Sequence, residues 1–419
     1  MAEWREVKLG DVVEIRRGAS PRPIHHFLSK AGIPWVKIAD ATSDDSRYIT
    51  HTNEYIKEEG VAHSVTVEPE TLIVSNSATP GLPKIMQIRA CVHDGWLVFS
   101  NYKGIIRDFL YYKFKEIQRS LVNQANGSVF QNLKTDIVRE FPISLPPVEM
   151  QRKIAGVLGA LDDKIELNNK INQNLELQAQ ALFKSWFVDF EPFGGTKPSD
   201  WKEIQLTEIA DFIGGYSYKG AELKQSTTAM ATIKNFDRNG GFKLDGYKEI
   251  EPSSKLKQNQ YVELFDTLVA HTDLTQNAEV IGNAEMLLSK GKYKNVIISM
   301  DVVRVVPKNG ISKYLLAAIL KDPHFKKHCL GYVNGTTVLH LSKRALPEYS
   351  LIFPKNVKIL DNISGLFEDL YKKIALNIEE NIRLSILRDT LLPKLMSGEI
   401  NVDNVDIFTF ERMQIDNDI

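Results

Sequence analysis

Two loops, one near the start of each half of the chain, carry side chains that suit contact with nucleic acid. Arginine can form two parallel hydrogen bonds with the edge of a guanine, and tyrosine and lysine can contact phosphates. The candidates are Arg16, Arg17 and Arg22 in the first loop and Tyr216, Tyr218 and Lys219 in the second. For each of them the alternative is a solvated loop whose charge has no ligand, and the residue types leave both readings open.

A second pair of matching segments adds further polar candidates. Residues 36–45 and 233–241 share a lysine, and residues 75–81 and 271–277 are rich in groups that form hydrogen bonds. The candidates are Lys37, Ser75 and Asn76 in the first half and Lys234, His271 and Thr272 in the second. Short polar side chains at a loop tip suit contacts with base edges or phosphates. The loops differ between the halves while the flanking residues match, as two readers of different sequences would require.

Patterns typical of catalysis are missing from the sequence. It has no Asn-Pro-Pro-aromatic tetrad, no GxxxxGK[ST], no GxSxG and no HExxH. His324 and His328, followed by Cys329, have the spacing of one helix face, but no carboxylate stands beside them at a ligand-like spacing. We therefore expect an ordinary helix surface there, and a chain with no catalytic residues, no metal and no cofactor of its own.

The candidate loops belong to an internal repeat, because the second half of the chain aligns with the first. Ungapped identities pair Trp4 with Trp201, Glu6 with Glu203, Leu9 with Leu206, Gly18 with Gly215, Ser20 with Ser217, Lys37 with Lys234 and Asp40 with Asp237. Later blocks align ETLIV (70–74) with DTLVA (266–270), NGSVFQNL (126–133) with NGTTVLHL (334–341), and FPISLPP (141–147) with YSLIFP (349–354). Each copy mixes strand-like runs with one amphipathic helix, at 108–124 and at 313–330. The expected fold class is α+β, with one fold used twice.

A long helix is expected to follow each copy. The segment between Lys164 and Asp189 has no proline or glycine, and its twin runs from about residue 357 to 392. Apolar residues recur at alternating steps of three and four, and asparagines interrupt both series at corresponding places, which is typical of a coiled-coil seam with a fixed register. The residues expected to pair the helices are Leu158, Leu161, Ile165, Asn168, Asn172 and Leu175 in the first and Phe367, Leu370, Ile374, Asn377, Asn381 and Leu384 in the second. The alternative is that each helix only packs on its own domain.

Composition bounds the class of protein without identifying it. The chain has 419 residues, 43% hydrophobic and 25% charged, which is the balance of a folded globular protein long enough for two or three domains. Lys and Arg number 52 against 53 Asp and Glu, so any surface for DNA must be local. The two cysteines are far apart, and no segment approaches 18 uninterrupted apolar residues. We expect a cytoplasmic protein.

The chain resembles the specificity subunit of type I restriction-modification systems over nearly its whole length. The motifs that carry the resemblance are the two openings (4–9 and 201–206), ETLIVSNSATPG, NGSVFQNL, LPPVEMQRKIAGVLGALDDKIELNNKI and DTLLPKLMSGEI. The second copy departs from the pattern, because HTDLTQN has no glycine where the first loop ends in one. That difference leaves the geometry of the second loop open.

The resemblance implies two target-recognition domains that each read half of a split site in double-stranded DNA, joined by two helices that pair antiparallel. It implies as partners two methyltransferase subunits that modify adenine, together with restriction/translocase subunits. The expected limits are 1–147 and 191–356 for the recognition domains, 148–190 and 357–400 for the conserved helices, and 401–419 for an acidic C-terminal tail.

The helices are expected to act as a spacer between the half-sites. A helix of about 35 residues spans roughly 50 Å, or about 15 base pairs of DNA. Removing one or two turns between Lys164 and Phe183 should then shorten the recognised gap. Two other functions stay open: a coiled-coil scaffold with two duplicated peptide- or RNA-binding domains, and an enzyme whose site has no recognised pattern. Sequence-dependent and salt-dependent duplex binding would separate the first from a DNA reader.

Overall fold

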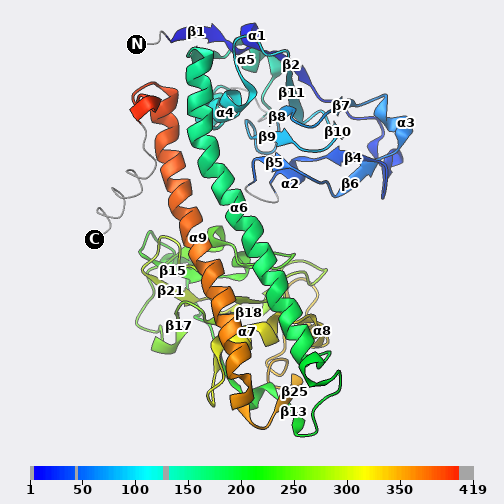
Figure 1. Cartoon of the computed structure of the whole chain (residues 1–419), viewed down its shortest axis with the longest axis vertical. Coiled ribbons are helices and arrows are strands. Elements are labelled where there is room, and N and C mark those ends of the chain that lie inside the picture. The colour runs from blue at the N-terminus through cyan, green and yellow to red at the C-terminus, as the bar shows by residue number, and fades with distance from the viewer. Residues whose placement is uncertain (1–3, 43–45, 126–131, 405–419) are drawn as a thin grey trace. The chain divides into compact units, whose positions relative to one another are not determined.

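The computed structural model describes residues 4–42, 46–125 and 132–404 (Figure 1). The chain divides into two compact units, unit 1 with residues Met1–Glu166 and Arg383–Ile419 and unit 2 with Leu167–Ile382. Each unit is described by itself below. Most of the first NG motif, at residues 126–131, and the acidic tail from residue 405 onward lie outside the described residues.

Unit 1 is built on two five-stranded sheets and a short strand pair. The pair joins β1 (Arg5–Lys8) antiparallel to β12 (Pro142–Leu145), which brings the start of the domain to its end. The first sheet has, in spatial order, β3 (Leu28–Ser29), β6 (Glu54–Ile56), β4 (Ile33–Val36), β10 (Ala90–Val92) and β7 (Val65–Val67). The second has β2 (Glu14–Arg17), β11 (Trp96–Ser100), β8 (Leu72–Ser75), β9 (Pro83–Met86) and β5 (Tyr48–Ile49). The helices are α1 (Leu9–Val12), α2 (Ile38–Ala41), α3 (Glu58–Val61), α4 (Arg107–Ala125) and α5 (Thr135–Glu140).

Unit 2 is built on the same plan. Its strand pair is β13 (Trp201–Gln205) with β25 (Ser350–Pro354). One sheet has β14 (Ala210–Gly214), β22 (Val302–Pro307), β18 (Thr267–Ala270) and β20 (Ala284–Met286). A second has β16 (Lys248–Glu249), β15 (Thr228–Ala231), β21 (Asn295–Ile298) and β17 (Tyr261–Val262), and a third has β19 (Thr272–Asp273), β24 (Leu339–Leu341) and β23 (Val333–Asn334).

Strand pairing confirms that one α+β fold is used twice. In unit 1, β10 lies between a parallel neighbour, β4, and an antiparallel neighbour, β7. In unit 2, β21 lies in the same way between β15 and β17. The antiparallel order β2-β11-β8-β9 in unit 1 likewise corresponds to β14-β22-β18-β20 in unit 2. Buried aliphatic strands such as β8 and β18 form the centre of each core, as expected for sheets covered on both faces.

The single helix predicted at 313–330 is wrong, because the structure has two. Helix α7 (Lys313–Lys321) ends at Asp322, and α8 (Pro323–Leu330) begins directly after it. A proline disfavours helical backbone in the residue before it, and it is well tolerated in the first turn of a new helix. The Asp322 side chain accepts a hydrogen bond from the His324 backbone amide and so caps α8.

The two long helices pair antiparallel, as predicted. They are α6 (Val148–Phe187) and α9 (Asp361–Met396), so the first begins well before Lys164, directly after Pro146 and Pro147. Within unit 2, Asn168 donates to the Asn381 side-chain oxygen at 2.9 Å, and Asn377 donates to that of Asn172 at 2.7 Å. The residue numbers of the bonded asparagines increase along α6 as they decrease along α9, which makes the pair antiparallel. Asn168 and Asn377 are buried, so a shifted register would leave these amides without partners.

The seam residues serve both the helix pair and the domains, so the alternative reading of the helices is partly right. Leu158 and Leu161 share a buried cluster with Leu384 of α9 and also with Phe109 of α4. Phe367 and Ile374 share another with residues of α7. Buried seam residues are Leu158, Leu161, Asn168, Phe367, Ile374, Asn377 and Leu384, and half-buried ones are Ile165, Asn172, Leu175, Leu370 and Asn381. Among the described residues, no helix is both long and apolar enough to cross a membrane.

Candidate nucleic-acid interface

A tight turn between β10 and β11 binds two of the candidate arginines of unit 1, Arg17 and Arg22. The Asp94 backbone oxygen accepts hydrogen bonds from Arg17 Nε at 2.7 Å and from Asn76 Nδ2 at 3.0 Å. The Asp94 carboxylate accepts from Ser20 Oγ at 2.8 Å and from Arg22 Nη2 at 3.2 Å. One residue of the turn therefore joins the strand β2, the loop after it and the loop that contains Asn76.

Electrostatics keep this carboxylate ionised. Burial opposes its ionisation, but the Ser20 hydroxyl, the backbone of the turn and the nearby Arg17 guanidinium outweigh burial and lower the pKa of Asp94 below its usual value. Burial also lowers the pKa of the neighbouring His93, whose Nδ1 accepts a hydrogen bond from the Gly95 amide. The turn therefore carries a negative charge between two exposed guanidinium groups at neutral pH.

The other candidates of unit 1 take different positions. Arg16 and Arg17 are the last residues of β2 rather than part of the loop after it, and Arg16 is exposed. Lys37 is half-buried and forms an ion pair with Glu54 at 2.5 Å. Ser75 is buried, and its hydroxyl bonds within its own loop to the Thr79 oxygen and the Leu82 amide.

Ser75 and Asn76 therefore do not lie open on a loop tip, as base or phosphate contacts would require. Both are buried, and their polar groups hold the loop at residues 75–81 against its own backbone and against the Asp94 turn. Short polar side chains readily bond to nearby backbone, which is the competing role that the residue types alone did not separate from ligand contact.

The candidates of unit 2 divide in the same way into exposed and buried groups. Lys219 and Lys234 are exposed and Tyr218 is half-buried. Tyr216 is buried, and its hydroxyl bonds to Glu222 at 2.6 Å and to Ser253.

His271 and Thr272 lie where β18 passes into β19. Thr272 is buried within β19, opposite His340. His271 is half-buried, and its backbone amide donates to the Asp301 oxygen at 2.8 Å. Burial lowers the pKa of His271, with a smaller contribution from His340 and Lys343, so its imidazole is neutral at neutral pH. Thr272 thus supports the sheet, while His271 stays close to the surface.

Two aligned glycines show that the turns of the two units occupy equivalent places. A Cβ on Gly18 would lie 2.1 Å from the His93 oxygen, and a Cβ on Gly215 would lie 1.9 Å from the Ser299 oxygen. The residue after that carbonyl is Asp94 in unit 1 and Met300 in unit 2. Met300 is 55% exposed, and the nearby loop that begins after β19 exposes Leu274. Unit 1 therefore presents an acid with two arginines where unit 2 presents a thioether.

We expect Gly18→Ala to lower the free energy of unfolding of unit 1 by about 1–3 kcal/mol, because the added methyl overlaps a backbone oxygen that no side-chain rotation can move. The matched control is Gly156→Ala on the exposed face of α6, where nothing lies within 4 Å of the new methyl. That change should raise the free energy of unfolding by about 0.5–1 kcal/mol, since alanine favours helix. Denaturant unfolding of both variants measures the difference, and equal effects would contradict the close approach.

Asp94 and Met300 were missed by the sequence reasoning. The Asp94-Gly95 pair between two apolar runs is a typical hairpin-turn signal and could have placed the turn. Nothing in the sequence could have shown that arginines from a strand far away in the chain close onto it. For Met300 the only signal was its position in the repeat, after the serine that faces Gly215.

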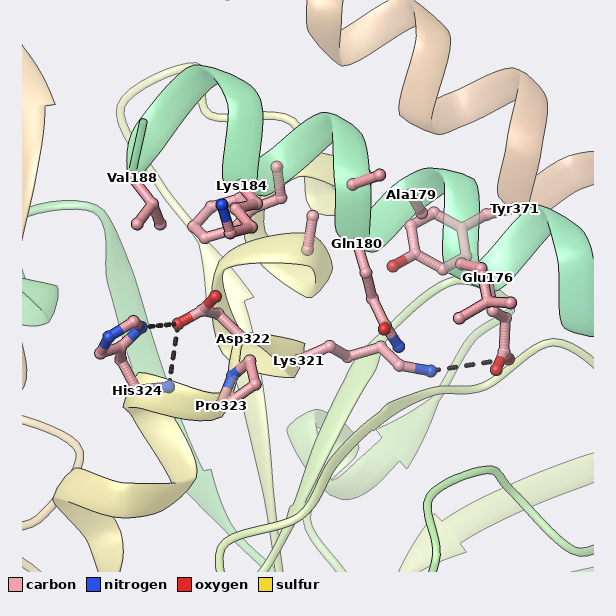
Figure 2. Close-up of a pocket in the computed structure, with 14 residues that line it drawn as sticks. Glu176, Ala179, Gln180, Lys184, Val188, Lys321, Asp322, Pro323, His324 and Tyr371 are labelled. Atoms are coloured by element: carbon pink, nitrogen blue, oxygen red, sulfur yellow. Dashed lines mark hydrogen bonds and ion pairs between the residues drawn. The ribbon is translucent and has the colours of Figure 1, made fainter. Parts of the chain in front are cut away.

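A cavity of about 340 Å³ lies in unit 2 between α6 and the junction of α7 with α8 (Figure 2). Its walls are largely apolar, and Lys321 extends along it toward Glu176 at 3.6 Å, with Glu285 at 2.7 Å. At its other end His324 bonds to Asp322 at 2.7 Å. These side chains are paired with one another and place no nucleophile beside a base.

The internal repeat relates this cavity to an ion pair of unit 1. In unit 1, Asp162 of α6 and Arg388 of α9 form an ion pair at 2.6 Å. The aligned residues in unit 2 are Tyr371 and Ala179, both of which line the cavity. The two units therefore have different chemistry at these aligned positions.

The thiol of Cys329 is protonated, and the imidazole of His328 is hydrogen-bonded within the protein. Burial raises the pKa of the Cys329 thiol to about 12, so the thiol is protonated at neutral pH. His328 bonds to the Ala345 backbone oxygen at 2.8 Å. The described residues contain no cluster of three or more His, Cys, Asp or Glu that could hold a metal ion.

Comparison with known proteins finds one matching family model and several curated relatives. Residues 1–177 match the model of the type I restriction modification DNA specificity domain. The specificity subunit of the type I restriction enzyme MjaIX from Methanocaldococcus jannaschii is 26% identical, over 96% of this chain and 95% of that one. The HindI specificity subunit from Haemophilus influenzae is also 26% identical, over 67% of this chain and 73% of its own.

A solved structure shares the fold. It is the S subunit of a type I restriction-modification system from M. genitalium, with a TM-score of 0.55 and 15% identity over 94% of this chain and 96% of that one. At that TM-score and coverage the two chains share a fold over nearly their whole length. The chain is thus similar, over most of its length, to specificity subunits of type I restriction enzymes.

Proposed function

We propose that this chain recognises a two-part sequence in double-stranded DNA and directs partner methyltransferase and restriction subunits to it. The observation that carries the proposal is that one fold occurs twice with different chemistry at the equivalent turn, Asp94 with two arginines in unit 1 and Met300 in unit 2. Two copies of one DNA-binding fold with different side chains at the equivalent turn suit two different half-sites. The matched relatives are specificity subunits of type I restriction enzymes, and the scaffold alternative has no such support.

The proposed DNA contacts are the candidates that the structure leaves exposed or half-buried. They are Arg16, Arg17, Arg22 and Lys37 in unit 1 and Tyr218, Lys219, Lys234 and His271 in unit 2. The structure adds the exposed Met300 to this set. Ser75, Asn76, Tyr216 and Thr272 then act by shaping the loops that carry these contacts. We keep residues 1–147 and 191–356 as the proposed limits of the two recognition domains, and the cytoplasm as the proposed location.

Exposed apolar residues on the long helices support the proposal that partner subunits bind there. Leu167 and Leu376 are exposed and align with each other in the repeat, as do Leu177 and Ile386. Apolar side chains left open at repeated positions suit burial against another protein. Because the positions are duplicated, the proposal assigns them to two copies of one partner, the methyltransferase subunit.

The test is the methylation of genomic DNA by the chain purified together with its methyltransferase subunit. We expect methylated adenines in one two-part motif with a fixed gap, and no such motif when the chain is omitted. A complex that methylates without sequence preference, or a chain that does not bind a methyltransferase, would overturn the proposal. In the second case the scaffold alternative would be the better one.

A further inference from the structure

The arginines around Asp94 are held in a fixed arrangement. Arg17 uses Nε to bond the Asp94 backbone oxygen, and its Nη2 lies 3.8 Å from the Asp94 carboxylate. Arg22, from the loop after β2, contacts the same carboxylate at 3.2 Å. Asp94 is itself anchored by Ser20 and by Asn76. The orientation of the Arg17 guanidinium is therefore set before any ligand arrives.

The exposed end of Arg17 is suited to a flat ligand with two acceptors. Its Nη1 and Nη2 have no hydrogen-bond partner among the residues that the structure describes, and the side chain is 55% exposed. Two such nitrogens form a fork that matches the O6 and N7 atoms of guanine. A phosphate can also accept both hydrogen bonds of such a fork, but only a base edge makes the contact depend on the DNA sequence, and this difference is what the experiment below tests.

We infer that Asp94 is a positioning residue that aims the Arg17 fork at a guanine in the half-site read by unit 1. The inference rests on the proposed function and adds to it a base and the residue that selects it. It is confined to one half of the site, because Met300 stands at the equivalent place in unit 2 and carries no charge.

The charge of Asp94 gives the inference a distinctive signature. A carboxylate at a DNA-facing turn repels phosphates, so removing it should strengthen binding to any duplex. The same change should release Arg22 and leave Arg17 held only by the Asp94 backbone oxygen, so that its fork is less firmly oriented and the choice of guanine weakens. A residue that only stabilised the fold would lower both kinds of binding together.

The experiment compares three variants of the complex with the methyltransferase subunit. Asp94→Asn keeps the size of the side chain and the backbone carbonyl but removes the charge. Arg17→Lys keeps the positive charge at this position but removes the pair of terminal nitrogens that form the fork. Glu68→Gln is the matched control, because Glu68 is also an exposed acid of unit 1 that pairs with an arginine, Arg89, at 3.2 Å. The measurements are the methylated motif across a genome and binding to a duplex that lacks the motif.

We expect Asp94→Asn and Arg17→Lys to lose discrimination at the same guanine of one half-site by roughly tenfold, with the other half-site unchanged. Asp94→Asn should also bind the unrelated duplex more tightly, whereas Glu68→Gln should keep the wild-type motif. If Arg17→Lys leaves the motif unchanged and only weakens binding uniformly, Arg17 contacts a phosphate and the inference is wrong. A loss shared by both half-sites would also overturn it. A wild-type complex without any motif would instead overturn the proposed function itself.

Discussion

Replacing Asp162 by alanine is expected to lower the free energy of unfolding of unit 1 by about 3–5 kcal/mol. Asp162 is 5% exposed and accepts hydrogen bonds from the Tyr112 hydroxyl and from Arg388 Nη1, both at 2.6 Å. Without it, the mostly buried Arg388 guanidinium keeps only one acidic partner, the exposed Asp389 at 2.8 Å. Its buried side toward Tyr112 is left without an acceptor, and a guanidinium cannot escape this cost by losing its proton.

The control for this prediction is the adjacent residue, Asp163. Its side chain is 67% exposed, and its partner Arg47 also has Glu166 nearby at 3.4 Å. Asp163→Ala should therefore cost less than about 1 kcal/mol. Denaturant unfolding gives the free energies, and hydrogen exchange along α6 shows whether the loss is local to unit 1.

The double variant Asp162→Leu with Arg388→Met separates the two sources of the loss. Replacing a buried ion pair by apolar residues of similar size is often neutral, so we expect much of the stability to return. Equal losses for Asp162→Ala and Asp163→Ala would show that burial of the pair does not matter.

Lengthening both long helices by two turns is expected to abolish methylation of the original motif and to create a motif whose gap is about three base pairs longer. The change duplicates residues 167–173 in α6 and 376–382 in α9. These segments align with each other in the repeat, and the hydrogen bonds of their asparagines cross the helix pair. Seven residues preserve the seam and add about 10 Å.

The control inserts the same seven residues into α6 alone. α6 would then hold two copies of Asn168 and Asn172 against one Asn377 and one Asn381, so one copy of the buried amides would lose its partners. We expect that variant to methylate neither motif. A genome-wide methylation map reads out both variants, and an unchanged gap in the doubly lengthened chain would show that the helices do not set the spacing.

The elements best predicted from sequence were those set by local patterns. The proline-free run between Lys164 and Asp189 predicted a helix, and the duplicated asparagines predicted its pairing, because a buried amide needs a partner wherever the fold puts it. The sheet order was beyond reach, since β10 and β4 are parallel neighbours that lie far apart in the chain. Such pairing depends on the packing of the whole domain rather than on a local pattern.

The candidate site was predicted in part, for a similar reason. Charged residues such as Arg17 and Lys219 were expected at the surface and lie there. Ser75 and Tyr216 were judged by residue type alone, and both are buried because their hydroxyls find partners inside the protein. Residue type states what a side chain can bond, and the fold decides whether that partner is the protein itself or a ligand.

The different anchoring of the two units bears on how new specificities arise in evolution. Tyr112 belongs to the globular part of unit 1, while its partners Asp162 and Arg388 belong to the long helices. A recombination that transplanted residues 1–147 alone would move Tyr112 into a recipient that can hold other residues at the positions of Asp162 and Arg388. Unit 2, for example, has Tyr371 and Ala179 at the aligned positions. Viable natural chimaeras should therefore have their crossover inside α6, beyond Asp162, so that Tyr112 and Asp162 are inherited together, and the recipient should hold a cation at the position of Arg388 in α9.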